Sequence, residues 1–115
     1  MSDYYLKVIL LKECPYSIAA DKLLDSNNIH PKKIRVDYND KEKFITNEYQ
    51  MFPQIYLRKH GYPNNLLLGG YTDLKEFIET FKNTKLNDTD INNFLNKKKN
   101  WSKKSTLRFI QFINS

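Results

Sequence analysis

The chain contains a single cysteine, and the residues around it favour a reactive thiol. Cys14 is followed by Pro15 in the stretch "KECPYS", directly after an apolar run. Because proline is favoured in the first turn of a helix, we expect Pro15 to begin a helix and Cys14 to be its N-cap. The free backbone amides of Tyr16 and Ser17, together with the helix dipole, would then point towards the sulfur and favour a thiolate. The alternative is an inert core thiol, which would not need the proline.

Other residues indicate the charge around this thiol and the compartment in which it would act. Lys12 lies two residues before Cys14 and would place a positive charge close to the sulfur. One cysteine cannot form an internal disulfide, so nothing implies an oxidising compartment. The first residues, "MSDYYLKVILLKE", contain Asp3 and Lys7 and are typical of neither a signal peptide nor a membrane span. We therefore expect a reducing, cytoplasmic setting without a membrane partner.

A second candidate feature is the stretch "MFPQIYL", in which Pro53 stands at the head of an expected strand. Proline is tolerated at such a position, and it holds the residue before it extended. If the Phe52–Pro53 bond is cis, the backbone N–H and C=O of Phe52 would face outward and could pair with an extended peptide. The alternative is a proline that only marks the entry to a strand.

A third feature, "GGYTD", combines two glycines with the start of a helix. Gly69 and Gly70 allow a sharp bend and the close approach of another backbone. Free amides at Thr72 and Asp73 would then form an anion site suited to a carboxylate. The alternative is a glycine turn before a capped helix, with Thr72 or Asp73 as the cap and Glu76 three residues after Asp73, as in a capping box.

The elements that position these features follow from the apolar patterns. Strands are expected at 4–11, 32–38, 53–60 and 66–70, and helices from Pro15 to about residue 25, at about 40–49 and at 71–82. Two further apolar helical patches lie at 91–95 and 107–113. This order predicts an α/β fold in which helices cover a mixed sheet. The three features would then share one end of the sheet, where open α/β sheets bind ligands.

The last third of the chain differs from the rest in charge. A length of 115 residues suits one domain, and the net charge is +6. Residues 83–115 hold 7 Lys and Arg against 2 Asp and Glu, whereas residues 1–82 are nearly balanced at 12 against 11. This tail is too apolar for disorder, so we expect it to pack on the body. Its lysines could bind nucleic acid or an acidic protein, but a solvated face between two helices is the preferred interpretation: Lys97, Lys98, Lys99, Lys103 and Lys104.

Together, "CPYS", "FPQIYL" and "GGYTD" resemble the motifs of glutaredoxins, in that order and over roughly residues 5–82. The spelling is similar to that of short bacterial or viral members. The resemblance implies a thioredoxin-like fold, with a four-stranded mixed sheet flanked by helices. Residues 1–83 would form the glutaredoxin-like domain, and residues 84–115 a basic helical C-terminal extension packed on it.

The resemblance also implies roles for individual residues. Cys14 would be the nucleophile, supported by Pro15, Tyr16, Ser17 and Lys12. Glutathione would bind to a second set, in which Thr72 and Asp73 hold its γ-glutamyl end: Phe52, Pro53, Gly70, Tyr71, Thr72 and Asp73.

Three positions depart from the family pattern. Ser17 stands where dithiol members have a second cysteine, and Met51 and Phe52 replace the usual Thr and Val. Lys12 is two rather than three residues before the nucleophile. A member with this pattern is expected to be a monomeric monothiol enzyme without a metal. Its partners would be glutathione as co-substrate and glutathionylated proteins, with no nucleic acid, and a viral member would act in the host cytoplasm or the virion.

Two other functions remain open at this level. One is a dimer that binds a 2Fe–2S cluster through two Cys14 thiolates and two glutathiones, although Pro15 argues mildly against it. The other is a catalytically weak, glutaredoxin-like adaptor in which the basic tail makes the functional contacts.

Overall fold

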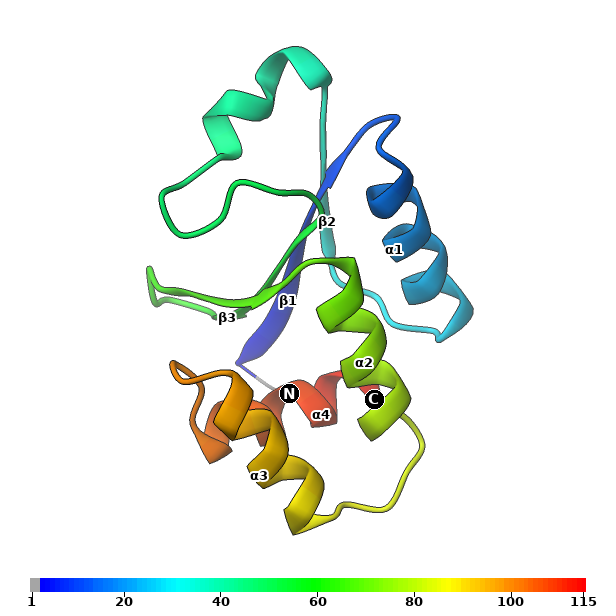
Figure 1. Ribbon diagram of the computed structural model, residues 1–115, viewed down its shortest axis with the longest axis vertical. Coiled ribbons are helices and arrows are strands. Elements are labelled where there is room, and N and C mark those ends of the chain that lie inside the picture. Colours follow the sequence, from blue (N-terminus) through cyan, green and yellow to red (C-terminus); the bar gives the residue numbers. More distant parts are fainter. Residues whose placement is uncertain (1–2) are drawn as a thin grey trace.

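Four strands form one mixed sheet in the computed structural model, which describes residues 3–115. The strand order is β2-β1-β3-β4, with β1 parallel to β2 and antiparallel to β3, and with β3 antiparallel to β4 (Figure 1). The bounds lie within two residues of those expected: β1 (Tyr4–Leu11), β2 (Lys32–Val36), β3 (Gln54–Lys59) and β4 (Asn65–Gly69). This is a thioredoxin-like arrangement of strands, as the sequence predicted.

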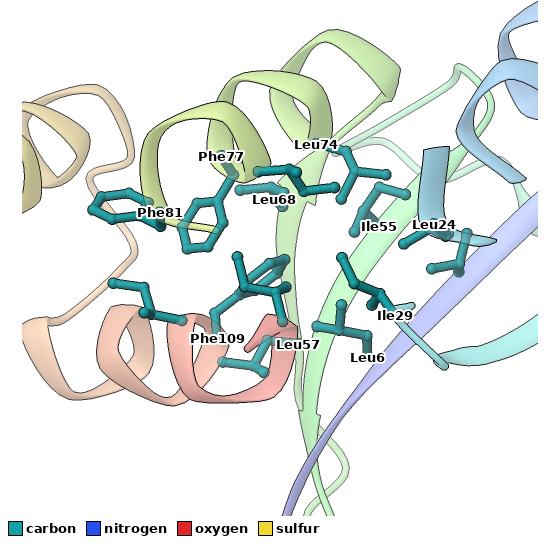
Figure 2. Close-up of a cluster of buried hydrophobic side chains, with 14 of the residues drawn as sticks. Leu6, Leu24, Ile29, Ile55, Leu57, Leu68, Leu74, Phe77, Phe81 and Phe109 are labelled. Carbon is teal, nitrogen blue, oxygen red and sulfur yellow. The ribbon is translucent and has the colours of Figure 1, made fainter. Parts of the chain in front are cut away.

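Helices α1, α2 and α4 pack on the same face of this sheet, and α3 packs beside α2 (Figure 1). Apolar residues of α1, α2 and α4 share one buried cluster with Leu6, Val8 and Leu10, which alternate along β1. Figure 2 shows Phe109 of α4 pointing from below towards Phe77 of α2. The bounds are α1 (Pro15–Ser26), α2 (Tyr71–Phe81), α3 (Asp88–Lys97) and α4 (Lys103–Ile113).

The opposite face of the sheet carries a smaller cluster and no α-helix among the described residues. Ile9, Val36 and Tyr56 are buried there, and Phe44 packs against them. The short helix expected at about 40–49 was only partly right, because a 3₁₀ helix at Tyr38–Phe44 is found there and ends earlier. None of the residues of this short helix is buried, so tertiary packing gives it little support. After it, Thr46 Oγ1 accepts a hydrogen bond from the Tyr49 backbone N–H at 3.0 Å, a local bond that competes with helix formation.

The C-terminal extension contributes to the main core. Trp101, between α3 and α4, is 6% exposed, and its ring meets the edge of Phe94 with centroids 5.3 Å apart. Phe109 and Phe77 lie 4.2 Å apart between centroids. Helix α4 begins four residues before the apolar patch at 107–113, because Ser102 caps it. Since the extension shares its core with the sheet, we propose that residues 3–83 and 84–115 fold as one unit.

Ion pairs fasten α1 to β2 at the edge of the sheet. Asp21 lies 2.6 Å from Lys33 Nζ and 2.8 Å from Arg35 Nη1, and Asp25 lies 2.7 Å from Lys33 Nζ. Burial alone would raise the pKa of Asp21, but its contacts with Lys33 and Arg35 outweigh burial and lower it. These contacts hold α1 against β2, and Cys14 is the N-cap of this helix.

Candidate functional site

Cys14 stands at the junction between β1 and α1, as expected. It is the N-cap of α1, Pro15 is the first helical residue, and the Ile18 backbone N–H donates to the Cys14 carbonyl at 2.9 Å. The preceding residue, Glu13, has a φ of 65°, which turns the chain sharply out of the strand. The thiol is partly exposed. The side chain at this position is held by the backbone at the helix start and is partly reachable from solvent.

The contacts expected for the sulfur are not met in this structure. The Cys14 side chain accepts no capping hydrogen bond at the described start of α1. A thiol is a weak hydrogen-bond acceptor, so the neutral side chain gains little by turning towards the amides of Tyr16 and Ser17. The side chain remains at the N-terminal end of α1, next to the first turn of the helix.

Ser17 has a structural contact that the sequence did not suggest. The residue is 2% exposed, and its Oγ accepts a hydrogen bond from the Leu11 backbone N–H at 3.0 Å. Through this bond the Ser17 side chain joins the first turn of α1 to the end of β1. Ser17 therefore holds the loop that presents the thiol.

Lys12 forms an ion pair away from the helix start. Its Nζ lies 2.9 Å from Asp37 Oδ1, and both side chains are more than half exposed. Its backbone N–H donates to the Val36 carbonyl at 2.9 Å and so extends the pairing with β2. Because Asp37 already neutralises the ammonium, Lys12 supports the site through the backbone more clearly than through its charge.

A groove of about 330 Å³ lies between Tyr16, in the first turn of α1, and the start of α2. The rings of Tyr16 and Tyr71 lie on it, with centroids 6.3 Å apart. Cys14 itself does not line the hollow, and Pro53 lies buried behind it, with a cis bond to Phe52. The lining includes six predicted residues and two that sequence reasoning missed, Tyr49 and Met51: Tyr16, Tyr49, Met51, Phe52, Gly70, Tyr71, Thr72 and Asp73.

The two glycines of "GGYTD" make room for the far end of this groove. Gly69 has a φ of 139°, and a Cβ there would lie 2.1 Å from Asp73 Oδ2. A Cβ on Gly70 would lie 2.4 Å from Tyr49 Oη. Because real Cβ atoms do not approach other atoms so closely, side chains at either position would displace Asp73 or Tyr49.

Both side-chain oxygens of Asp73 accept hydrogen bonds in the candidate site. Helix α2 begins at Tyr71 with Gly70 as N-cap, so the caps expected at Thr72 or Asp73 with Glu76 were wrong. Asp73 is instead the third residue of the helix, and its Oδ2 accepts from the Gly70 backbone N–H at 3.0 Å. The first backbone hydrogen bond of the helix runs from the Leu74 N–H to the Gly70 carbonyl, which leaves the amides of Tyr71, Thr72 and Asp73 at the helix start as donors for an anion.

The second oxygen of Asp73 meets a residue from the C-terminal extension. Lys98 Nζ donates to Asp73 Oδ1 at 2.7 Å. Burial and then the negative charge of Asp73 raise the pKa of Tyr49, whose ring also lines the groove. Lys98 was expected to be one of several solvated lysines, and no local sequence signal separates it from Lys97 or Lys99.

The fold and this geometry define a thioredoxin-like protein with a single cysteine beside a groove. Among solved structures, the chain is similar to glutaredoxin 1 from Francisella tularensis, in a crystal structure complexed with cacodylate. The identity is 23%, the TM-score is 0.54, and the match covers 70% of this chain and 99% of that chain. This likeness shows that the chain has the glutaredoxin fold, with additional residues beyond it.

Other comparisons found no relatives. No protein-family model matches the chain, and no curated protein matches it. Within residues 3–115, no three His, Cys, Asp or Glu side chains are grouped to hold a metal ion. In the same range, no helix is long and apolar enough to span a lipid bilayer.

Proposed function

We propose that this protein is a glutathione-dependent thiol–disulfide oxidoreductase that acts on protein–glutathione mixed disulfides by a monothiol mechanism. The observation that carries the proposal is the placement of the single thiol of Cys14 at the start of α1, next to a groove that ends at the start of α2. The glutaredoxin fold of the similar structure supports the same chemistry. Glutathione would be the co-substrate, and the reaction would take place in a reducing compartment. The protein would act as a monomer and without nucleic acid.

The groove suits the shape and charge of glutathione. Its tyrosine-lined end near Cys14 would take the cysteinyl part, whose backbone could pair with that of Phe52. Its other end offers the amides of Tyr71 and Thr72 for a carboxylate and the Asp73 side chain for an ammonium group. The γ-glutamyl end of glutathione carries both groups on one carbon atom.

The reaction would proceed by two thiol–disulfide exchanges. The Cys14 thiolate attacks the glutathionyl sulfur of the mixed disulfide, the S–S bond breaks, and the target protein leaves as a thiolate that takes up a proton. A second glutathione thiolate then attacks the glutathionyl sulfur held on Cys14. Glutathione disulfide leaves, and the Cys14 thiolate is restored. Each step needs three sulfur atoms nearly in line, and a groove that fixes the glutathionyl group provides this alignment.

The test compares two substrates in wild type and in Cys14→Ser. Wild type should reduce a glutathionylated peptide in the presence of glutathione, and Cys14→Ser should lose this activity. Insulin mixed with an equimolar amount of pre-reduced protein, without glutathione, should be reduced poorly, because no second cysteine is present to resolve a mixed disulfide with a protein. Fast reduction of insulin, or full activity of Cys14→Ser on the glutathionylated peptide, would rule out the monothiol mechanism.

A further inference from the structure

The ion pair between Asp73 and Lys98 lies where the candidate groove meets two other hollows. One hollow, of about 450 Å³, runs along β4 to Trp101, and another, of about 250 Å³, lies between α2 and α3. Asp73 lines all three hollows, and Lys98 lines the latter two. The two side chains are 34% and 26% exposed. Both side chains are therefore partly shielded from water. A ligand in the groove would meet Asp73, and it would meet Lys98 where it extends past Asp73 into either hollow.

The backbone holds Lys98 at this place. Its N–H donates to the Phe94 carbonyl at 2.9 Å, and its carbonyl accepts from the Trp101 N–H at 3.0 Å. Trp101 is buried against Phe94 and Phe109. Phe94 and Trp101, which hold the backbone of Lys98 from either side, both pack in the core. The ammonium group of Lys98 therefore stays within reach of Asp73. Its sequence neighbours Lys97 and Lys99 are exposed and serve as natural controls.

We propose that Lys98 is a specificity-determining residue, and that with Asp73 it selects ligands ending in a free α-amino acid group. This inference rests on the proposed function and adds a residue from the C-terminal extension to its site. Asp73 would accept from the ligand's ammonium group while Lys98 donates to the ligand's carboxylate. Each carboxylate oxygen has two lone pairs, so Asp73 Oδ1 can accept from the ligand and from Lys98 together.

The unliganded ion pair explains why such a ligand would be preferred. A ligand with both charges would add its ammonium group next to Asp73 and its carboxylate next to Lys98. The four groups would then alternate in charge. A ligand without the carboxylate brings only an ammonium group, which meets the Lys98 charge without compensation. Charge-assisted hydrogen bonds at a partly shielded site are stronger than exposed surface pairs, so we expect about a threefold to tenfold preference from Lys98.

The experiment measures binding of unreactive ligands by NMR titration, separately from turnover. The ligands are S-methylglutathione and the S-methyl derivative of 4-aminobutyryl-cysteinylglycine, which lacks only the α-carboxylate. Lys98→Ala should weaken the binding of S-methylglutathione by about threefold to tenfold. It should not weaken the binding of the second ligand, whose ammonium group no longer meets the Lys98 charge. Lys97→Ala and Lys99→Ala, each of which removes the same charge next to Lys98, should change neither. A thermal unfolding curve of each variant confirms that the proteins compared are folded.

Several outcomes would overturn the inference. One such outcome is that Lys98→Ala weakens the binding of both ligands equally. Another is that Lys97→Ala or Lys99→Ala weakens the binding of S-methylglutathione as much as Lys98→Ala does. Tighter binding of S-methylglutathione by Lys98→Ala would show that Lys98 competes with the ligand instead of binding it. No binding of S-methylglutathione to wild type at millimolar concentration would also refute it. Selective binding through Lys98 without any turnover of a glutathionylated peptide would instead refute the proposed function alone.

Discussion

The indole Nε1–H of Trp101 donates a hydrogen bond to the backbone carbonyl of Leu67 at 2.9 Å. Leu67 lies on β4, the outermost strand of the sheet on that side, so the C-terminal extension satisfies a carbonyl of that strand. The same indole packs in the core between Phe94 and Phe109. The extension is thereby tied to the strand that leads into the "GGYTD" segment.

We expect substitutions of Trp101 to separate these two contributions to stability. Trp101→Phe keeps most of the buried ring but leaves the Leu67 carbonyl without this donor, and should lower the free energy of unfolding by about 1 kcal/mol. Trp101→Ala also opens a cavity and should cost about 3–5 kcal/mol. Urea unfolding measures both, with exposed Leu86→Ala as a control near zero. No loss for Trp101→Phe would contradict the role of the hydrogen bond, and equal losses for the Phe and Ala variants would contradict the role of ring packing.

Ser17→Ala should lower stability while leaving the chemistry of Cys14 intact. The substitution removes the acceptor of the Leu11 N–H from a site that is 2% exposed, and an unsatisfied buried donor costs about 1–3 kcal/mol. Chemical unfolding measures the loss. The alkylation rate of Cys14 by iodoacetamide, taken well below the unfolding transition, should stay within about twofold of wild type because the hydroxyl oxygen accepts from Leu11. A much slower alkylation would show that Ser17 acts on the thiol itself.

Asp73→Asn should raise the KM for a glutathionylated substrate. The amide oxygen of asparagine can still accept from the Gly70 N–H, so the start of α2 is kept while the negative charge is lost. Loss of one charge-assisted hydrogen bond to the ligand corresponds to about a tenfold change. Steady-state kinetics gives KM, and the rate of Cys14 alkylation is the control, since Asp73 would bind the end of the ligand remote from its sulfur. An unchanged KM with slowed alkylation would show that the assignment of Asp73 is wrong.

The ion pairs between α1 and β2 should make stability depend on acid pH. Burial opposes the charge of Asp21, but contacts with Lys33 and Arg35 lower its pKa below the ordinary value of about 3.9. A lowered pKa means that the carboxylate stabilises the fold above the unfolded-state pKa, and that this contribution disappears as the pH falls through the folded-state pKa.

The measurement compares wild type with Asp21→Asn by urea unfolding at several pH values. The difference in unfolding free energy should be roughly 1 kcal/mol and constant above about pH 5, then shrink towards zero as the pH falls below about 4. Asp40→Asn, which removes the exposed pair with Lys43, should show almost no difference at any pH. A difference for Asp21→Asn that persists unchanged at pH 2 would mean that its effect is not electrostatic.

Local sequence signals were sufficient for most of the fold. The alternation of Leu6, Val8 and Leu10 placed β1, and Pro15 after Cys14 placed the start of α1. They failed at residues 40–49, where a plausible helical segment has no apolar stripe to bury and ends in a hydrogen bond between Thr46 and Tyr49. They also misplaced the cap of α2, because Gly70 has no side chain to signal its position and Asp73 reaches back to it.

The sequence by itself determined where the thiol, the proline at the strand entry and the glycine pair lie along the chain. Each depends on the conformational preferences of neighbouring residues, which are independent of distant packing. Only the tertiary structure decided that Lys98, 25 residues after Asp73, lies against its carboxylate, and that Trp101 reaches Leu67 across 34 residues. Such pairs form because α3 and α4 bury aromatic rings against α2 and the sheet, and the buried rings set which polar groups meet at their rim.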